Sequence, residues 1–546
     1  MKQLKRTLCI VTALAMSVSL FMACSKKEDP KTQDKTAGSG KDTKVVWEKA
    51  PKVVGVHENN GSIETALGKN GHTLEDNPYN RYIFEKTGVR LEMKLLPSGS
   101  TEFKQKLAVE LAGGNQIDFI TYFNLQQDWM DTGTILPIAS FMQKYKQHTA
   151  NIEKDIPQDA WDGVTKVGSK GEDVIWGFPI RNEFGKPNLR GLYYRKDWLD
   201  KLKLEVPKTT DDLTKVMKAF TENDPDGNGQ KDTFGLGTSK GFTHANWWMQ
   251  LFGVDTYREE LVGDKLVPYA HTEKAKYAYK TISNWVKSGY VNMEGFTDGK
   301  ANENKIVNGK IGVMVASFSD IARFYETMHA NGIKEAKWSL LDTPLVSSFD
   351  NKAYGFTRSD NFANVTMITA QAKESNYESI MKLLNWAYSP EGTDFLEYGF
   401  EGKEHKLVNG KKVRDTQYMY ADQKTYLSVY EIGKSYNHVW PENFVQNFNV
   451  AKDLATQYSN AVATKGDQIS WKPTDIKYKY PDLESFKLYP DYRKAIQDSQ
   501  GKFVLGELDA NDPKVWEDYN KQTEKYGFYK LLDEAYKKHY VEFKKK

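Results

Sequence analysis

The sequence predicts an α/β protein with two lobes, each built on its own sheet. Short apolar segments alternate with amphipathic ones along the first third of the chain, as strands and helices do in a largely parallel sheet. The chain has 546 residues, and even after processing its body is too long for one hydrophobic core. Pattern and length together therefore predict two α/β domains, whose ligands bind beyond the carboxyl ends of the strands.

The first lobe begins with a clear strand–helix–strand series. We expect a strand at Lys52–Val56, a helix at Pro78–Thr87 and a second strand at Val89–Leu95, in which apolar residues alternate. An apolar helical stripe from Phe103 to Leu111 and a strand at Ile117–Phe123 follow. This β-α-β-α-β order predicts a sheet with helical cover.

The middle of the chain holds its densest set of local signals. Leu192–Tyr194 is a short apolar strand, and Asp197–Leu202 an amphipathic run. Thr209 and Asp212 have capping-box spacing at the start of another helix. An apolar strand ending at Ser317 comes later. These elements indicate the second sheet.

An acidic loop after that capped helix has the spacing of a calcium site. Oxygen donors fall at loop positions one, three, five, seven and nine, namely Asp224, Asp226, Asn228, the backbone carbonyl of Gln230, and Asp232. Gly229 stands at position six, where the chain must turn sharply, but position twelve is Gly235 and not the usual glutamate. We expect a structural Ca²⁺ ion. The alternative is a solvated turn, because Asp, Asn and Gly favour turns without any ion.

The N-terminus predicts secretion and lipid attachment. Residues 1–23 combine a basic start with an apolar run too short to span a membrane comfortably, which indicates a signal peptide. Cys24 follows in a setting that resembles a bacterial lipobox, although Phe21 stands where an aliphatic residue is usual. An ordinary secretory signal is the alternative. Acylation of Cys24, for example by palmitate, would anchor the protein to the cell membrane.

Residues 24–44 form the acylated cysteine and its tether. From Ser25 to Lys44 there is no large apolar residue, so the segment cannot bury enough surface to become ordered. Twenty flexible residues reach roughly 25 Å. The expected arrangement is a globular body held close to a membrane surface.

Charge and cysteine content exclude several classes of protein. The chain has 76 basic and 73 acidic residues, and removing the signal peptide with its three basic residues makes them equal. This balance argues against nucleic acid partners and against electrostatic membrane binding, which leaves the lipid anchor as the expected membrane contact. Cys24 is the only cysteine of the mature chain, so an internal disulfide, a cysteine-ligated metal and a catalytic thiol are excluded.

Aromatic residues are abundant and suit a carbohydrate ligand. They make up 13% of the chain, with 13 Trp and 31 Tyr, and their flat apolar faces can stack on pyranose rings. For any single aromatic residue, a place in the core is at least as good an interpretation.

Several of these segments resemble one known family. The run from Arg195 to Gly237, with its RKDWLDKL and DPDGNG sequences, resembles the family 1 extracellular solute-binding proteins, lipoproteins that serve carbohydrate ABC importers. Tyr398–Gly402 resembles the family's YGIEG motif, Val174–Pro179 its crossover strand, and Trp338–Pro344 its return crossover. The resemblance implies a type II periplasmic-binding-protein-like fold with crossover hinge strands. The implied lobes are 45–180 plus 345–410, and 181–344 plus 411–546.

The resemblance also implies a function. The protein is expected to be a monomeric receptor, no enzyme, that captures a sugar or oligosaccharide between closing lobes and delivers it to an ABC permease. A secreted glycoside hydrolase or lyase is the alternative, but no spacing singles out a catalytic carboxylate pair. A structural adhesin would need repeats that the chain lacks.

Candidate ligand residues follow from where strands end. Polar and aromatic side chains beyond each predicted strand or crossover, or from motifs later in the chain, give eleven positions: Glu58, Asn59, Asn124, Trp129, Arg181, Glu183, Trp247, Trp248, Phe318, Glu401 and Trp440.

Overall fold

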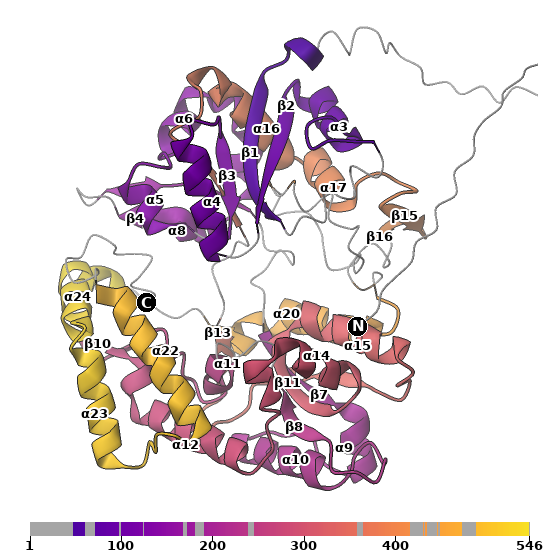
Figure 1. The fold of residues 1–546 in the computed structure, drawn as a ribbon, viewed down its shortest axis with the longest axis vertical. Coiled ribbons are helices and arrows are strands. Elements are labelled where there is room, and N and C mark those ends of the chain that lie inside the picture. Colours follow the sequence, from indigo (N-terminus) through magenta and orange to yellow (C-terminus); the bar gives the residue numbers. More distant parts are fainter. Residues whose placement is uncertain are drawn as a thin grey trace, which may run out of the picture. The chain divides into compact units, whose positions relative to one another are not determined.

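The computed structural model describes residues 47–59, 71–97, 100–123, 125–167, 172–180, 190–237, 245–357, 364–414, 430, 432–433, 445, 448–471 and 488–544. Its contacts separate Met1–Lys49 from Ala50–Lys546. The second unit contains two main sheets, each with its own helices and core (Figure 1). The signal peptide, Cys24 and the tether lie outside the described residues.

The first sheet has five strands. Its order is β2 (Arg90–Pro97), β1 (Lys52–Asn59), β3 (Phe119–Tyr122), β14 (Asn364–Ile368) and β6 (Phe178–Ile180). β1 is parallel to β2 and β3, whereas β14 is antiparallel to β3 and to β6. The carboxyl ends of β1, β2, β3 and β6 and the start of β14 therefore lie at one edge.

Helices cover both faces of this sheet. The larger are α3 (Pro78–Thr87), α4 (Ser100–Ala112), α16 (Tyr377–Ala387) and α17 (Pro390–Tyr398). The prediction for α3 is confirmed at both ends. Asn77 accepts the N–H groups of Tyr79 and Asn80, both at 3.0 Å, and Gly88 ends the helix in the left-handed region with φ 70°.

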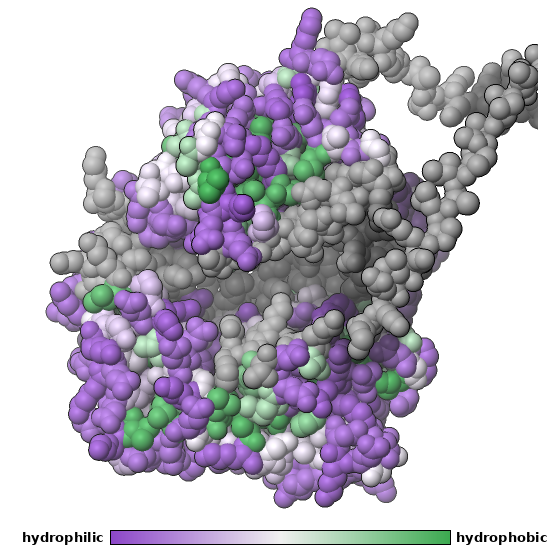
Figure 2. All heavy atoms as spheres, viewed as in Figure 1, coloured by the Kyte–Doolittle hydropathy of each residue, from purple (hydrophilic) through white to green (hydrophobic). Residues whose placement is uncertain are grey.

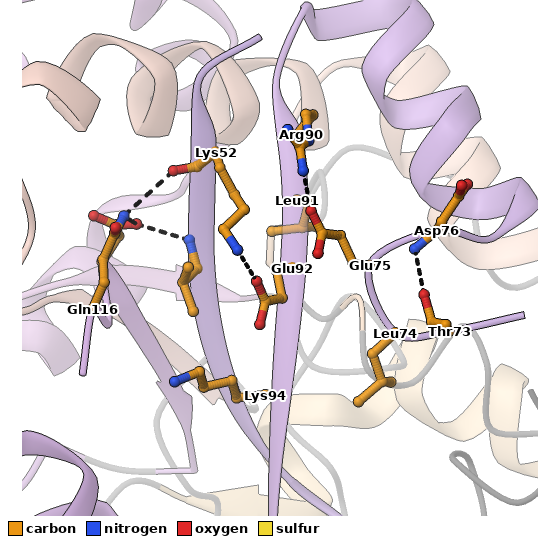
Figure 3. Close-up of polar contacts among 12 residues, drawn as sticks. Lys52, Thr73, Leu74, Glu75, Asp76, Arg90, Leu91, Glu92, Lys94 and Gln116 are labelled. Carbon is orange, nitrogen blue, oxygen red and sulfur yellow. Dashed lines mark hydrogen bonds and ion pairs between the residues drawn. The ribbon is translucent and has the colours of Figure 1, made fainter. Parts of the chain in front are cut away.

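Polar contacts join β1 to its neighbours at the start of the strand. Lys52 Nζ lies 2.5 Å from Glu92 of β2, and Arg90 pairs with Glu75 (Figure 3). Gln116, just before β3, donates to the carbonyl of Lys52 at 3.4 Å and to Asp118 at 2.8 Å. The contacts of Lys52 thus join the start of β1 to β2 on one side and to the segment before β3 on the other.

The rest of the first lobe consists of short elements: α5 (Gln127–Asp131), α6 (Ala139–Lys144), η1 (Lys146–His148), α7 (Ala150–Asp155), α8 (Gln158–Val164), the hairpin β4 (Thr165–Val167) and β5 (Asp173–Ile175), η4 (Glu374–Asn376), and the hairpin β15 (His405–Val408) and β16 (Lys411–Arg414).

The second sheet has four strands. Its order is β12 (Trp338–Leu340), β7 (Arg190–Arg195), β11 (Ile311–Ser317) and β8 (Phe234–Gly237). β7 is antiparallel to β11 and β12, and β8 is parallel to β11. The start of β7 and the carboxyl ends of the other three strands therefore share an edge.

Two cores fill the two faces of the second sheet. One face packs on α9 (Lys196–Leu202), α10 (Thr210–Glu222), α11 (Ala245–Gln250), α12 (Glu273–Lys287), α22 (Tyr489–Leu505), α23 (Pro513–Glu524) and α24 (Phe528–Lys544). The other packs on α14 (Gly299–Val307), α15 (Phe318–Ala330) and α20 (Lys452–Ile469). The predicted capping box is present, with Asp212 N–H donating to Thr209 at 3.0 Å.

Smaller elements complete this lobe: the hairpin β9 (Glu259–Val262) and β10 (Lys265–Pro268), η3 (Tyr269–His271), α13 (Glu294–Thr297), and the pair β13 (Phe356–Thr357) and β17 (Ser470–Trp471).

The return to the first sheet comes later than the sequence suggested. Residues 338–340 form strand β12, hydrogen-bonded to β7 within the second sheet, because apolar Trp338 and Leu340 pack into that lobe's core. Leu345 and Phe356 also belong to the second lobe's core, whereas Tyr430 and Ile432 pack in the first. Thr357 thus still belongs to the second lobe and Asn364 to the first sheet, so the lobe boundaries predicted at 344/345 and at 410/411 both lie later in the chain.

Large apolar side chains on the surface are scattered. On the face drawn in Figure 2, the described residues are mainly hydrophilic, with small hydrophobic patches. Among the described residues, no helix has both the length and the apolar character needed to cross a membrane.

Candidate functional site

At the strand-end edge of the first sheet, aromatic and acidic side chains gather around Tyr122. Phe123, directly after β3, is 43% exposed, and its ring centre lies 4.3 Å from that of buried Tyr122. The ring centre of Trp129 lies 5.5 Å from that of Tyr122. Burial raises the pKa of the Tyr122 hydroxyl, and the charges of Glu58 and Asp128 add to this effect. Glu58 therefore lies at this cluster, although it lies within β1 and does not follow the strand as predicted, because β1 continues to Asn59.

At the corresponding edge of the second sheet, Arg190 and Trp247 form a stacked pair. Arg190 starts β7 opposite Ser317, the last residue of β11. The carbon of its guanidinium lies 4.4 Å from the Trp247 ring centre on α11. The Ser317 hydroxyl hydrogen-bonds Ser319 at 3.0 Å and donates to the Asp320 carboxylate at 2.8 Å, and it caps α15 by accepting the N–H of Asp320 at 3.2 Å.

Two pockets lined by described residues are candidates for ligand binding. One, beside the start of β7, is lined mainly by apolar side chains with Arg190 at its rim, and its volume of about 20 Å³ holds roughly one water molecule. The other has about 370 Å³ and is lined by side chains of α6, α7, α8, β4 and β5, including Trp161. Only the second reaches the size of ligand pockets, roughly 300 to 1,000 Å³.

Three predicted ligand residues are buried in the structure. Trp129 is 6% exposed, Trp248 1% and Phe318 0%. Phe318 stacks on Tyr458 with 4.7 Å between ring centres, and Trp248 packs edge-on against Phe296 at 5.6 Å. A side chain in this state has no free face for a sugar, so the structure gives these residues a packing role.

The remaining predicted ligand residues are dispersed. Glu401 follows α17 and is exposed. Its backbone forms an isolated β-bridge with His405, and no contact joins it to either strand-end cluster among the described residues. Asn59 ends β1. Asn124, Arg181, Glu183 and Trp440 lie outside the described residues.

The acidic loop after α10 is organised by its own hydrogen bonds and by one lysine. Asp224, in the left-handed region with φ 46°, accepts N–H groups from Gly227, Asn228 and Gly229 at 2.9 to 3.1 Å. The N–H of Gly229 leads in lowering the pKa of this carboxyl group. Gly229 has φ 74°, as the sharp turn at position six requires.

Lys310, just before β11, lies between the other two carboxylates of this loop. Its Nζ is 2.7 Å from both Asp226 and Asp232. Burial alone would raise the pKa of Asp232, but hydrogen bonds from Lys310 and Asn228 outweigh it and lower that pKa. In the described chain, no group of three or more His, Cys, Asp or Glu side chains is close enough together to hold a metal ion. Two carboxylates of the loop thus lie against an ammonium group.

Two exposed or half-buried residues were missed by the sequence reasoning. Phe123 is the last residue of the predicted strand Ile117–Phe123, and Arg190 lies two residues before the predicted strand Leu192–Tyr194. The end of β3 one residue earlier makes Phe123 a surface side chain. The start of an antiparallel strand shares an edge with the ends of its neighbours, so Arg190 at the start of β7 lies beside Ser317 at the end of β11.

Comparison with known proteins identifies the family. The sequence model of the family described as "Bacterial extracellular solute-binding protein" matches residues 69–394, more than half of the chain. The fructooligosaccharide ABC transporter substrate-binding protein FusA of Streptococcus pneumoniae serotype 4 is 24% identical over 486 residues, which cover 81% of this chain and 83% of FusA. The lipoprotein LipO of Bacillus subtilis strain 168 is 22% identical over 437 residues, 78% of this chain and 81% of LipO.

Solved structures agree with the fold. The alginate-binding protein AlgQ2, solved without calcium ion, matches with a TM-score of 0.64 and 19% identity over 89% of this chain and 97% of its own. An EF-hand mutant of S. pneumoniae FusA in complex with fructo-nystose matches with a TM-score of 0.61 and 18% identity over 91% of this chain and 100% of its own. Both have the two-lobed fold that the sequence predicted. The chain belongs to the family of bacterial extracellular solute-binding proteins.

Proposed function

We propose that this protein captures a sugar or oligosaccharide outside the cytoplasm and delivers it to the permease of an ABC transporter. The observation that carries the proposal is the placement of aromatic and charged side chains at one strand-end edge of each sheet, Phe123 and Glu58 on the first and Arg190 and Trp247 on the second. Strand ends of α/β sheets are where ligands bind. FusA, whose match covers 81% of this chain, is named as the substrate-binding protein of a fructooligosaccharide ABC transporter.

The mechanism we propose is a shift between open and closed lobes. A ligand that contacts both edges binds the closed state more tightly, and the closed population rises by that difference in affinity. No bond of the sugar is made or broken. The aromatic side chains supply flat apolar surface, while Glu58 and Arg190 supply a hydrogen-bond acceptor and a donor.

A panel of oligosaccharides tests this function. A ligand that binds only the native state stabilises it, by about 2.7 kcal/mol at a concentration one hundred times the Kd. This stabilisation is seen as a higher melting temperature. We expect at least one member of the panel to do so, and Phe123→Ala to weaken binding of that sugar by roughly 1 to 3 kcal/mol. Val109→Ala, a change at an exposed apolar residue of α4 that is 65% exposed, is the control. No shift with any glycan would contradict the proposal.

An enzymatic role is the weaker candidate, and we propose that the protein has none. Asp118, one of the carboxylates that a hydrolase could have used, is fully buried and accepts hydrogen bonds from Val54, Gln116 and Asn376. The family and the relatives above are binding proteins. Release of reducing sugar from a ligand that raises the melting temperature would overturn this view.

We further propose that the Asp224–Asp232 loop binds a structural calcium ion. The support is the spacing of its oxygens, the left-handed turn at Gly229 and the convergence of Asp226 and Asp232 on a positive charge. The ion would be held by Asp224, Asp226, Asn228, the carbonyl of Gln230, and Asp232, and Lys310 would have to leave. A cation of charge two that replaces an ammonium group rigidifies the loop between α10 and β8.

Calcium is therefore expected to raise the melting temperature of the chelator-treated protein, and magnesium to do so poorly because it demands octahedral geometry. Asp226→Ala should abolish the response. Lys310→Met is the matched variant, and it should bind calcium more tightly because the competing cation is gone. Equal melting curves in chelator and in calcium would show that the loop is a turn and no more.

The membrane anchor is the third part of the proposal. We propose that residues 1–23 are a signal peptide and that Cys24 is acylated, which the relative named lipoprotein LipO supports. Cys24→Ser should then move the protein from the detergent phase to the aqueous phase in a detergent partition assay. Cys9→Ser, within the signal peptide, is the control and should leave the mature protein in the detergent phase. Retention of the Cys24→Ser protein with detergent would exclude this anchor.

A further inference from the structure

Arg190 has a position and a setting that bear on the chemistry of the ligand. It is the first residue of β7, partly exposed, at the strand-end edge of the second sheet and at the rim of the small apolar pocket. The carbon of its guanidinium lies over the ring of Trp247, 4.4 Å from the ring centre. Stacking engages the face of a guanidinium and leaves its N–H edge for polar partners.

No hydrogen bond or ion pair to the Arg190 guanidinium occurs within the described part of the chain. Other arginines of the same lobe differ in this respect. Arg195 also stacks on a tryptophan, but it donates to both oxygens of Asp197 at 2.8 and 2.6 Å. Arg323 stacks on Phe324 at 4.4 Å and pairs with Glu303. Arg190 thus has an aromatic partner of the same kind but no carboxylate partner among the residues that the structure describes.

Within the described residues, two charges act on Arg190, those of Asp255 and Arg258. Asp255 is 4% exposed, and it accepts a hydrogen bond from Asn246 at 2.9 Å and faces Arg258 at 3.9 Å. Burial lowers the pKa of the Arg190 guanidinium, Asp255 opposes this, and Arg258 adds to it. The opposite charges of Asp255 and Arg258 offset one another, so among the described residues no carboxylate is left over to pair with Arg190. A partly buried charge without a counter-ion is costly and favours binding of an anion.

We propose that Arg190 receives a carboxylate of the ligand and that the natural substrate is an acidic oligosaccharide containing uronic acid residues. The proposal rests on the sugar-receptor function above. A carboxylate matches the fork of a guanidinium with two parallel hydrogen bonds, whereas a neutral sugar offers only hydroxyl dipoles. The relatives leave the choice open, because AlgQ2 is named for alginate, which is acidic, and FusA for fructooligosaccharide, which is neutral.

Calorimetric titration of the purified mature protein with matched sugars separates the two classes. The acidic probes are oligogalacturonides and alginate oligosaccharides, and the neutral probes are fully methyl-esterified oligogalacturonides and fructo-oligosaccharides. Methyl esterification keeps the rings and removes the charge. We expect an acidic probe to bind roughly 10 to 100 times more tightly than its neutral counterpart, the value of a hydrogen-bonded charge pair, and its affinity to fall as salt is added.

Variants then assign the effect to Arg190. Arg190→Met keeps an unbranched apolar side chain against Trp247 and should remove most of the preference for the acidic probe. Arg190→Lys keeps the charge without the fork and should restore part of it. Arg323→Met is the matched control, since it removes a guanidinium stacked at the same distance that already has a carboxylate partner, and it should leave the preference unchanged.

The outcomes distinguish this proposal from the function on which it rests. Tighter binding of an acidic probe, lost in Arg190→Met, supports it. Equal or tighter binding of neutral probes, or a preference for acidic probes that survives in Arg190→Met, overturns the role of Arg190 while the sugar-receptor function stands. Binding of no glycan at all overturns both.

Discussion

Replacing Asp118 by alanine is expected to destabilise the first lobe by about 3 to 5 kcal/mol. The side chain is fully buried. Its Oδ2 accepts the N–H of Val54 and the amide of Gln116, both at 2.8 Å, and Asn376 donates to both of its oxygens at 3.2 Å. One carboxylate thus joins β1, the entrance to β3 and η4. Alanine leaves these buried donors without an acceptor, and each costs about 1 to 3 kcal/mol.

The free energy of unfolding in urea measures the effect, and hydrogen exchange of the β1 and β3 amides shows whether it is confined to the first lobe. The stability of Asp118→Asn should lie between those of the parent and of Asp118→Ala, because asparagine keeps one acceptor oxygen but places an amide donor against the donors of Val54, Gln116 or Asn376. Asp128→Ala, at an aspartate whose side chain is 62% exposed, is the control and should change stability by less than about 0.5 kcal/mol. A fully stable Asp118→Ala protein would show that water replaces the carboxylate.

Acidification is expected to loosen the C-terminal helices through His271. This side chain, in η3, lies 2.8 Å from the hydroxyls of both Tyr529 and Thr523, so it ties α23 and α24 to the second lobe. Burial lowers its pKa to about 4, against about 6.5 in an unfolded chain. Between these values the unfolded chain binds the additional proton. Stability is therefore lost as the pH falls from about 6.5 toward 4, by roughly 3 kcal/mol in total.

Melting temperatures measured from pH 7 to pH 4 test this, with tyrosine and tryptophan fluorescence as the signal. His271→Gln retains an amide that can donate and accept, and it should flatten the part of the pH dependence due to this group. His148→Gln removes an imidazole from the first lobe and should leave the pH dependence due to His271 unchanged. If His271→Gln and the parent lose stability in parallel down to pH 4, the titration belongs to other groups.

Local sequence patterns predicted the elements that depend on near neighbours. Pro78, Asn77 and Gly88 determine the ends of α3 because a cap acts within one turn of the helix. Thr209 and Asp212 determine the start of α10 in the same way. The alternation of apolar residues in β2 and the apolar run of β11 were likewise sufficient to identify strands.

The tertiary structure alone decided which aromatic side chains are available to a ligand. Phe318 is buried because Tyr458, 140 positions later, stacks on it, and no spacing near Phe318 contains that partner. The same holds for the return crossover. Residues 338–340 have the composition of any apolar strand, and only their hydrogen bonds to β7 assign them to the second sheet.

The sequence by itself thus determined the class of fold, the helix caps and the spacing of the acidic loop, all of which arise from interactions a few residues apart. Only the tertiary structure brought Lys310 between Asp226 and Asp232, 84 and 78 positions earlier in the chain, and stacked Arg190 on Trp247 without a carboxylate partner among the described residues. The physical reason is that charge compensation and burial depend on distance in space, and chain folding brings together groups that the sequence keeps far apart.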